Sequence, residues 1–169
     1  TCLVDEETDE REEYSKDLAL LDSRPSVRLK DLICNLRLNN GQCGLIRLNS
    51  LRRTGLDRPY RGGDITLMAE LAILGKFLVL PEVLLFRRMG PTTFSRFLKK
   101  EGYKAFYGER ANQALASHRL HRHFEILCAA MFYPIEWREK LASTKVAISQ
   151  VFWDLASYRR HRSQPTSLS

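Results

Sequence analysis

Apolar and polar residues follow one kind of pattern up to residue 93 and another beyond it. In the first part, helical spacing at 26–36, 50–54 and 64–74 alternates with short apolar runs that predict strands at 1–4, 43–48, 77–80 and 83–86. The second part has helical spacing alone, at 94–107, 111–133 and 134–162. We therefore predict an α/β unit over 1–93, an all-helical segment over 94–162 and a disordered tail over 163–169.

The composition is that of a globular protein. Hydrophobic residues make up 44% of the 169 positions and charged residues 28%, which excludes a wholly disordered chain and a collagen-like repeat. The most apolar stretch, 67–86, is interrupted by charged residues, Gly75 and Pro81, so no membrane span is predicted. The four cysteines lack metal-site spacing and follow no secretory leader, and we interpret them as reduced core thiols of a cytoplasmic protein. Because the chain starts with Thr1, we expect it to be a piece of a longer protein.

Charge is distributed unevenly along the chain, whose formal net charge is +7. Residues 1–22 carry nine acidic and two basic side chains, whereas the remainder carries 25 basic and 11 acidic ones. A positive field of this kind attracts the phosphate groups of nucleic acids, anionic lipids or nucleotides. The arginines of the C-terminal helices are scattered and accompany no nucleic-acid recognition motif, so nucleic acid is the least favoured of these partners. The pattern favours a solubilising surface with some attraction to the inner face of an anionic membrane.

Several motifs in the first part occur in an order that resembles a known enzyme family. They are the stretch Gly41 to Gly55 (GQCGLIRLNSLRRTG), the loop Tyr60-Arg-Gly-Gly-Asp64 with the helix after it, the segment Gly75-Lys-Phe-Leu-Val-Leu-Pro-Glu82, and the strand Leu85-Phe-Arg-Arg-Met89. Together they resemble the acceptor-side half of a bacterial family 2 glycosyltransferase, over residues 1–95.

The resemblance implies a partial GT-A-like fold, in which a mixed sheet is flanked by helices. It also implies transfer of a sugar from a nucleotide-sugar to a hydroxyl acceptor, with inversion at the sugar carbon. Such enzymes bind the nucleotide and a divalent metal, Mg²⁺ or Mn²⁺, through a half that precedes the matching region. We therefore expect this chain alone to hold no metal and to transfer no sugar. We also expect it to self-associate where the sheet lacks its usual neighbours.

The resemblance assigns roles to four residues. The carboxylate of Asp64 is the expected general base, which takes the proton of the acceptor hydroxyl; the alternative is that Asp64 is the N-cap of the following helix. Arg87 and Arg88 occupy a strand on which neighbours point to opposite faces, so one of them is expected to bind the donor diphosphate. The alternative there is a solvated strand end. Tyr60 is expected among the substrate-binding residues, and the family's usual histidine is replaced by Gly90.

A histidine cluster in the second part could suggest a metal site. His118, His121 and His123 lie close together in the sequence. No acid or cysteine completes a tetrahedral set at the usual spacing, so a basic solvated face is favoured over a metal.

Aromatic residues near the C-terminus could form a sugar platform, but we interpret them as core or helix-packing residues: Trp137, Phe152, Trp153 and Tyr158. Besides a glycosyltransferase, two other classes of protein stay open. One is a non-catalytic interaction module with the same half-fold, and the other is a basic nucleic-acid-binding protein.

Overall fold

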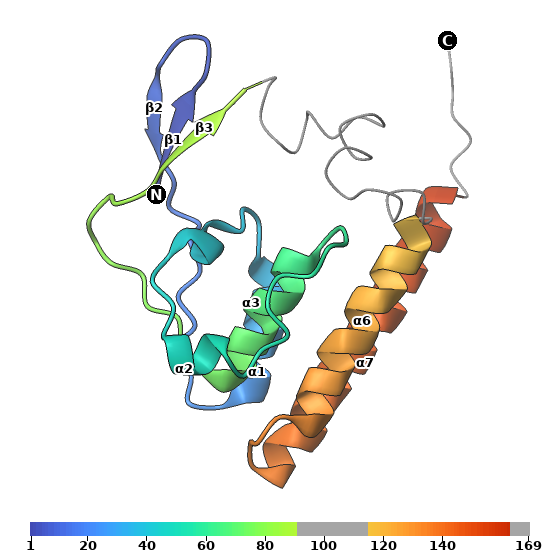
Figure 1. Ribbon diagram of the computed structural model, residues 1–169. Helices are drawn as coiled ribbons and strands as arrows, with labels where there is room; N and C mark the ends of the chain where they lie inside the picture. The colour runs from blue at the N-terminus through green and yellow to red at the C-terminus, as the bar shows by residue number, and fades with distance from the viewer. Residues whose placement is uncertain (91–114, 163–169) are drawn as a thin grey trace.

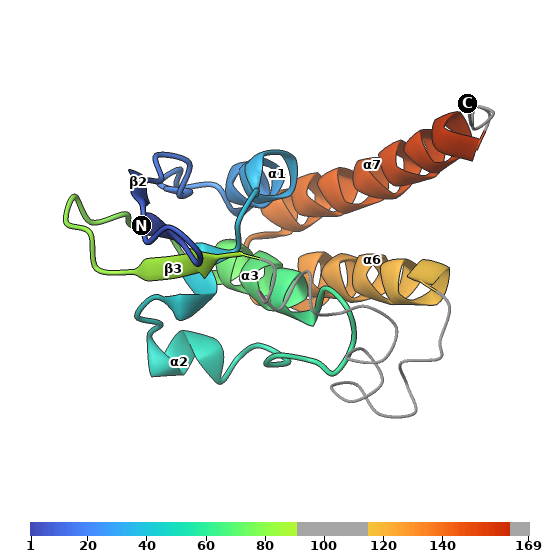
Figure 2. The same cartoon turned by 90° about the horizontal axis from the view of Figure 1, so that it is seen from above.

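The chain forms a small mixed sheet at one end and a group of packed helices at the other (Figures 1 and 2). The computed structural model describes residues 1–90 and 115–162. The helix predicted over 94–107 and the tail predicted over 163–169 lie outside these residues. The mixed α/β character that the sequence predicts is confirmed.

The strands of the sheet come from both ends of the 1–90 segment. The central strand is β1 (Cys2–Asp5), with β2 (Arg11–Glu13) antiparallel on one side and β3 (Phe86–Met89) parallel on the other. The register pairs Leu3 with Arg87 and Val4 with Arg88. The strand predicted over 1–4 is therefore confirmed, and it is the one that holds the other two together.

Helices account for most of the described chain. They are α1 (Pro25–Asn35), α2 (Leu48–Leu51), α3 (Gly63–Leu74), α6 (Leu115–Phe132) and α7 (Trp137–Arg162), with the 3₁₀ turn η1 (Asn40–Cys43) before α2. The helices predicted at 26–36, 64–74 and 134–162 are confirmed, as is the described part of the one at 111–133. None of the described helices combines the length and apolar character needed to cross a bilayer.

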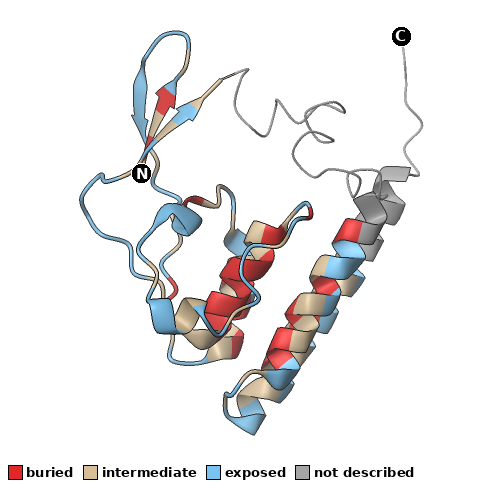
Figure 3. Ribbon diagram, viewed as in Figure 1, coloured by how far each residue is buried: buried red, intermediate tan, exposed pale blue. Residues whose placement is uncertain are grey.

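The core surrounds α3, which is buried along most of its length (Figure 3). Its sequence is apolar on nearly every side, so it can accept neighbours from several directions. α1 packs on one side of α3 and α6 on another, while α7 packs against both α1 and α6. Leu29 and Leu32 of α1 and Ala129 and Ala130 of α6 join α3 in one continuous core.

A buried arginine closes the C-terminal end of α3. Arg28 is only 4% exposed, and its Nε and Nη2 atoms donate to the carbonyl oxygens of Ala72 and Ile73 at 2.7 and 2.9 Å. Its Nη1 atom donates to the carbonyl oxygens of Asp22 and Ser23. One guanidinium thus satisfies carbonyl groups that the end of a helix leaves without partners.

Three of the predicted strands are wrong. Residues 43–48 run from the last residue of η1 to the first residue of α2, with a loop at 44–47 between them. Residues 77–80 contribute only an isolated bridge between Phe77 and Leu20. The strand predicted at 83–86 begins only at Phe86. A strand needs a neighbour to take up its backbone hydrogen bonds, and the described chain places no further strand beside these segments.

The predicted packing of the C-terminal aromatics is also wrong where the structure describes it. Trp137, Phe152 and Trp153 are each more than 60% exposed, while the side chain of Tyr158 lies outside the described residues. The buried side of α7 carries Ser143 and Ala147 instead. Such small side chains let α7 approach α1 and α6 closely, which leaves no room for aromatic rings between these helices.

The cysteines are unpaired, as predicted, but they do not all lie in the core. All four are free thiols, but Cys34 and Cys43 are exposed. Only Cys2 is buried, so the expectation of core thiols fails for two of the four.

Candidate functional site

Asp64 lies in the first turn of α3, at its second residue. The N-cap is Gly62, so the alternative that Asp64 caps this helix is wrong. The Asp64 carboxylate is half-buried and accepts a hydrogen bond from Asn39, with 3.0 Å between Nδ2 and Oδ2. An acidic side chain is also favoured in the first turn by the partial positive charge of the helix N-terminus. The position therefore holds a carboxylate in one orientation while leaving it accessible.

Two glycines are needed to place Asp64 there. Gly62 has a φ of 95°, in the left-handed region that a side chain disfavours. A Cβ on Gly63 would collide with the backbone carbonyl of Arg58. The preceding loop thus folds back tightly against the first residue of α3.

The neighbouring residues Asn39 and Asn40 join Asp64 to the sheet. Asn40 is only 4% exposed; its Oδ1 accepts from Nη1 of Arg87 at 2.8 Å, and its Nδ2 donates to Asp17 at 2.9 Å. The structure therefore links two of the predicted site residues, Asp64 and Arg87, through consecutive asparagines. Neither asparagine is marked as a site residue by the sequence, since an Asn-Asn-Gly run after a helix indicates only a helix stop.

The two arginines of β3 differ in their surroundings. Arg87 is half-buried and bound to Asn40, whereas Arg88 is exposed. The burial of β3 alternates residue by residue, as expected for neighbours that point to opposite faces. The structure thus brings Arg87, and not Arg88, into the same network as Asp64.

Tyr60 belongs to the loop that precedes α3, and its side chain is buried. Its hydroxyl donates to Glu125 at 2.5 Å and shares a hydrogen bond of 2.7 Å with Thr66. Its ring also meets that of His121 edge-on, with 4.9 Å between the centroids. Burial, and then the hydrogen bond to Glu125, raise the pKa of Tyr60 well above its ordinary value. These contacts give Tyr60 a part in holding the loop in place.

Arg58 ties the same loop to two helices. Its Nη2 lies 2.8 Å from Glu70 of α3, and its Nε lies 2.9 Å from Glu125 of α6. Glu70 is 2% exposed and also accepts a hydrogen bond from the backbone nitrogen of Gly55. Nothing in the local sequence marks these partners, because they are separated by many residues.

Asp57, in the loop before α3, places a second carboxylate near Asp64. Desolvation, together with the negative charge of Asp64, raises the pKa of Asp57. Asp57 is the more exposed of the two. It therefore offers a chemically matched neighbour against which the role of Asp64 can be measured.

The histidine cluster is not the solvated face that the sequence predicts. His118 and His123 are 2% and 8% exposed, and only His121 faces solvent. His123 lies 3.0 Å from Asp154 of α7, so it packs inside the α6–α7 pair. In residues 1–90 and 115–162, no three His, Cys, Asp or Glu side chains are grouped so that they could hold a metal ion.

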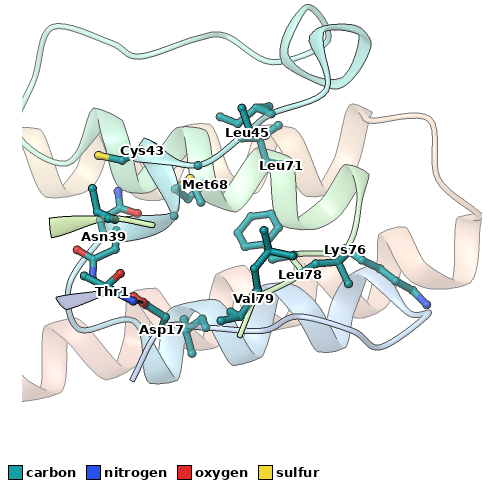
Figure 4. A pocket seen from close by; sticks show the side chains of 18 of the residues that line it. Thr1, Asp17, Asn39, Cys43, Leu45, Met68, Leu71, Lys76, Leu78 and Val79 are labelled. Carbon is teal, nitrogen blue, oxygen red and sulfur yellow. Dashed lines mark hydrogen bonds and ion pairs between the residues drawn. The ribbon is translucent and has the colours of Figure 1, made fainter. Parts of the chain in front are cut away.

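A cleft of about 810 Å³ opens beside Asn39 (Figure 4). Its walls are mostly apolar and come from α3, from the segment that follows η1, and from residues 75–85. Leu45 and Leu78, which line it, are largely exposed. Asn39, Asp17 and Lys76 supply polar groups along the same cleft. A ligand with an apolar portion and a few polar groups would match this lining.

No family model matches the chain, and neither a curated protein nor a solved structure matches it.

Proposed function

We propose that this chain is the acceptor-side part of a glycosyltransferase, in which Asp64 is the general base. The observation that carries the proposal is the placement of the Asp64 carboxylate. This carboxylate lies in the first turn of α3, where a hydrogen bond from Asn39 fixes it. The next residue, Asn40, accepts a hydrogen bond from Arg87. Transfer from a diphosphate donor to a hydroxyl requires a base held in one orientation and positive charge for the diphosphate, and this network connects the two.

The proposed reaction is a single displacement. The acceptor hydroxyl gives its proton to Oδ1 of Asp64, and its oxygen forms the new bond to the anomeric carbon. The bond from that carbon to the nucleoside diphosphate breaks on the opposite side, so the configuration inverts. Asn39 holds Oδ2 of Asp64, which leaves Oδ1 for the acceptor.

Of the two arginines of β3, we assign only Arg87 to the donor side. It fixes Asn40 and contributes positive charge from its half-buried position, whereas Arg88 is exposed on the opposite face and has no part in the proposed reaction. Tyr60 is proposed to shape the acceptor side by holding the loop before Asp64, since its hydroxyl is bound to Glu125 and Thr66.

We propose that the divalent metal of the complete enzyme, Mg²⁺ or Mn²⁺, is held outside the described residues. These contain no group that could hold such an ion, so no step is assigned to a metal here. The nucleotide-sugar is likewise proposed to be held by a part of the enzyme that precedes the matching region. On its own, the present chain is then expected to give no transfer when it is incubated with nucleotide-sugars and Mn²⁺.

The test uses the product of the complete gene that contains this chain, with a panel of nucleotide-sugars and hydroxyl acceptors. Asp64→Asn keeps the size of the side chain and removes its basicity, so turnover should fall by about 10² to 10⁴ while the melting temperature stays unchanged. Asp57→Asn is the matched control and should retain turnover. Undiminished turnover in Asp64→Asn would overturn the assignment.

A further inference from the structure

The outer side of the α6–α7 pair is apolar and uncovered. On α6, the exposed residues Leu120, Phe124 and Met131 recur at helical spacing. α7 carries four exposed apolar residues at similar spacing: Trp137, Leu141, Ile148 and Phe152. We call these seven residues the outer stripe.

Both halves of the outer stripe point away from the core. The core-facing side of α6 carries Ile126, Ala129 and Ala130, and that of α7 carries Ala147. Because α1 packs against α7 and α3 packs against α6 on those sides, the stripe lies on the opposite side of the pair. Phe124 is 63% exposed and Phe152 is 68% exposed. A patch of large apolar side chains on this scale indicates an interaction surface.

The charges around the outer stripe are mostly positive. Arg119, Arg138 and Lys145 are exposed on the two helices, and Glu136 is the one exposed acid among residues 118–154. The other acids in that range have partners inside the fold: Glu125 with Arg58, Glu139 with Ser26, and Asp154 with His123. Exposed basic side chains on the two helices therefore outnumber the one exposed acid.

This charge pattern selects the partner. Two copies of the chain that met through their stripes would each bring an excess of positive charge to the interface, which opposes their association. An anionic lipid surface instead attracts every one of these groups. The long stems of Arg and Lys can lie along apolar surface while their charged ends reach lipid headgroups. The guanidinium of Arg138 already lies 5.4 Å from the centre of the Trp137 ring.

We propose that the outer stripe binds the surface of an anionic lipid bilayer, with α6 and α7 lying along the interface. Apolar side chains beside basic ones are typical of helices that lie in a membrane interface, and tryptophan favours this depth. The described helices are not suited to crossing a bilayer, which agrees with a position along it. The proposal does not depend on the glycosyltransferase activity.

The two tryptophans of the chain allow a direct test. Trp137 and Trp153 are the only ones in the sequence, and both lie on α7, each 63% exposed. With vesicles that contain phosphatidylglycerol, tryptophan emission should shift to the blue and be quenched by lipids brominated in their acyl chains. With phosphatidylcholine alone the response should be weaker, and added salt should reduce binding to the anionic vesicles.

Paired variants separate the stripe from the rest of the surface. Leu141→Ser with Phe152→Ser should abolish the blue shift, whereas Leu45→Ser with Leu78→Ser, which changes exposed leucines of the cleft, should not. Arg138→Gln with Lys145→Gln should lower partitioning into anionic vesicles about tenfold or more. Arg52→Gln with Arg53→Gln is the matched control for charge.

Three results would overturn the proposal. One is no binding of the unaltered chain to anionic vesicles in sedimentation. Another is an equal loss of binding in the cleft variant. The third is a blue shift that appears on raising the protein concentration without lipid and does not change when vesicles are added, which would identify a second copy of the chain as the partner.

Discussion

Arg58 and Glu125 form an ion pair in which Nε lies 2.9 Å from Oε1. This contact fastens the loop before α3 to α6, two segments more than 60 residues apart. Because Arg58 also binds Glu70 of α3, the loop is held between two helices. The helical part of the chain is therefore structurally coupled to the position of Asp64, although it contributes no residue to the proposed reaction.

The first prediction concerns Glu70 in this network. Glu70→Gln keeps the shape of the side chain but removes the charge that pairs with Arg58. We expect a loss of about 3 kcal/mol in the free energy of unfolding, because the change leaves a partly buried guanidinium short of a partner. Urea unfolding would measure this, with the exposed Glu136→Gln as a control that should stay within about 0.5 kcal/mol. Equal stability of the two variants would show that the network contributes little.

A second prediction tests the arginine at the end of α3. Arg28→Lys keeps the charge but replaces a planar group with several donors by a single ammonium. Since Arg28 donates to four carbonyl oxygens, we expect stability to fall by about 2–4 kcal/mol. Arg24→Lys, at an exposed ion pair, should have almost no effect. A neutral Arg28→Lys variant would mean that water can replace these contacts.

The third prediction separates a glycine required by close packing from one that is not. Gly63→Ala places a Cβ against the carbonyl of Arg58, so we expect the loop to shift and stability to fall by about 1–3 kcal/mol. Gly75→Ala meets nothing nearer than 4.0 Å and has extended backbone. It should leave stability unchanged or raise it by up to about 1 kcal/mol. Thermal unfolding of both variants measures the contrast, and similar melting temperatures would contradict it.

The fourth prediction is a pH dependence that arises from His123. Burial, and then the charge of Arg122, lower its pKa below the ordinary value of 6.5, although Asp154 acts in the opposite direction. As the pH falls through 6.5, the unfolded chain takes up this proton before the folded chain does, so folding stability should decrease. In His123→Gln the decrease between neutral pH and the folded-state pKa should be smaller. Urea unfolding at a series of pH values checks the slope, and parallel curves for the two proteins would refute the assignment.

The sequence predicts local features of this fold better than long-range ones. The helix at 64–74 is evident because Ile65 to Leu74 is almost continuously apolar and Gly75 ends it. The strands at 43–48 and 77–80 were wrong because an apolar run shows that a segment is apolar, not that another strand lies beside it. In the site, Asp64 and Arg87 could be chosen from motifs, whereas their connection through Asn39 and Asn40 depends on packing between distant segments.

The pairing of β1 with β3 has a consequence for how the chain folds. Cys2 aligns with Phe86 and Asp5 with Met89, so a strand at the beginning of the chain cannot gain this neighbour until the polypeptide has been made almost to residue 90. Contacts between residues so far apart form slowly, because a long loop must close first. During synthesis we therefore expect α1 and α3 to associate before β3 joins the sheet. A ribosome-bound chain that ends before Leu85 should then protect amides in those helices from hydrogen exchange, while the amide of Cys2, which donates to the carbonyl oxygen of Leu85, stays unprotected.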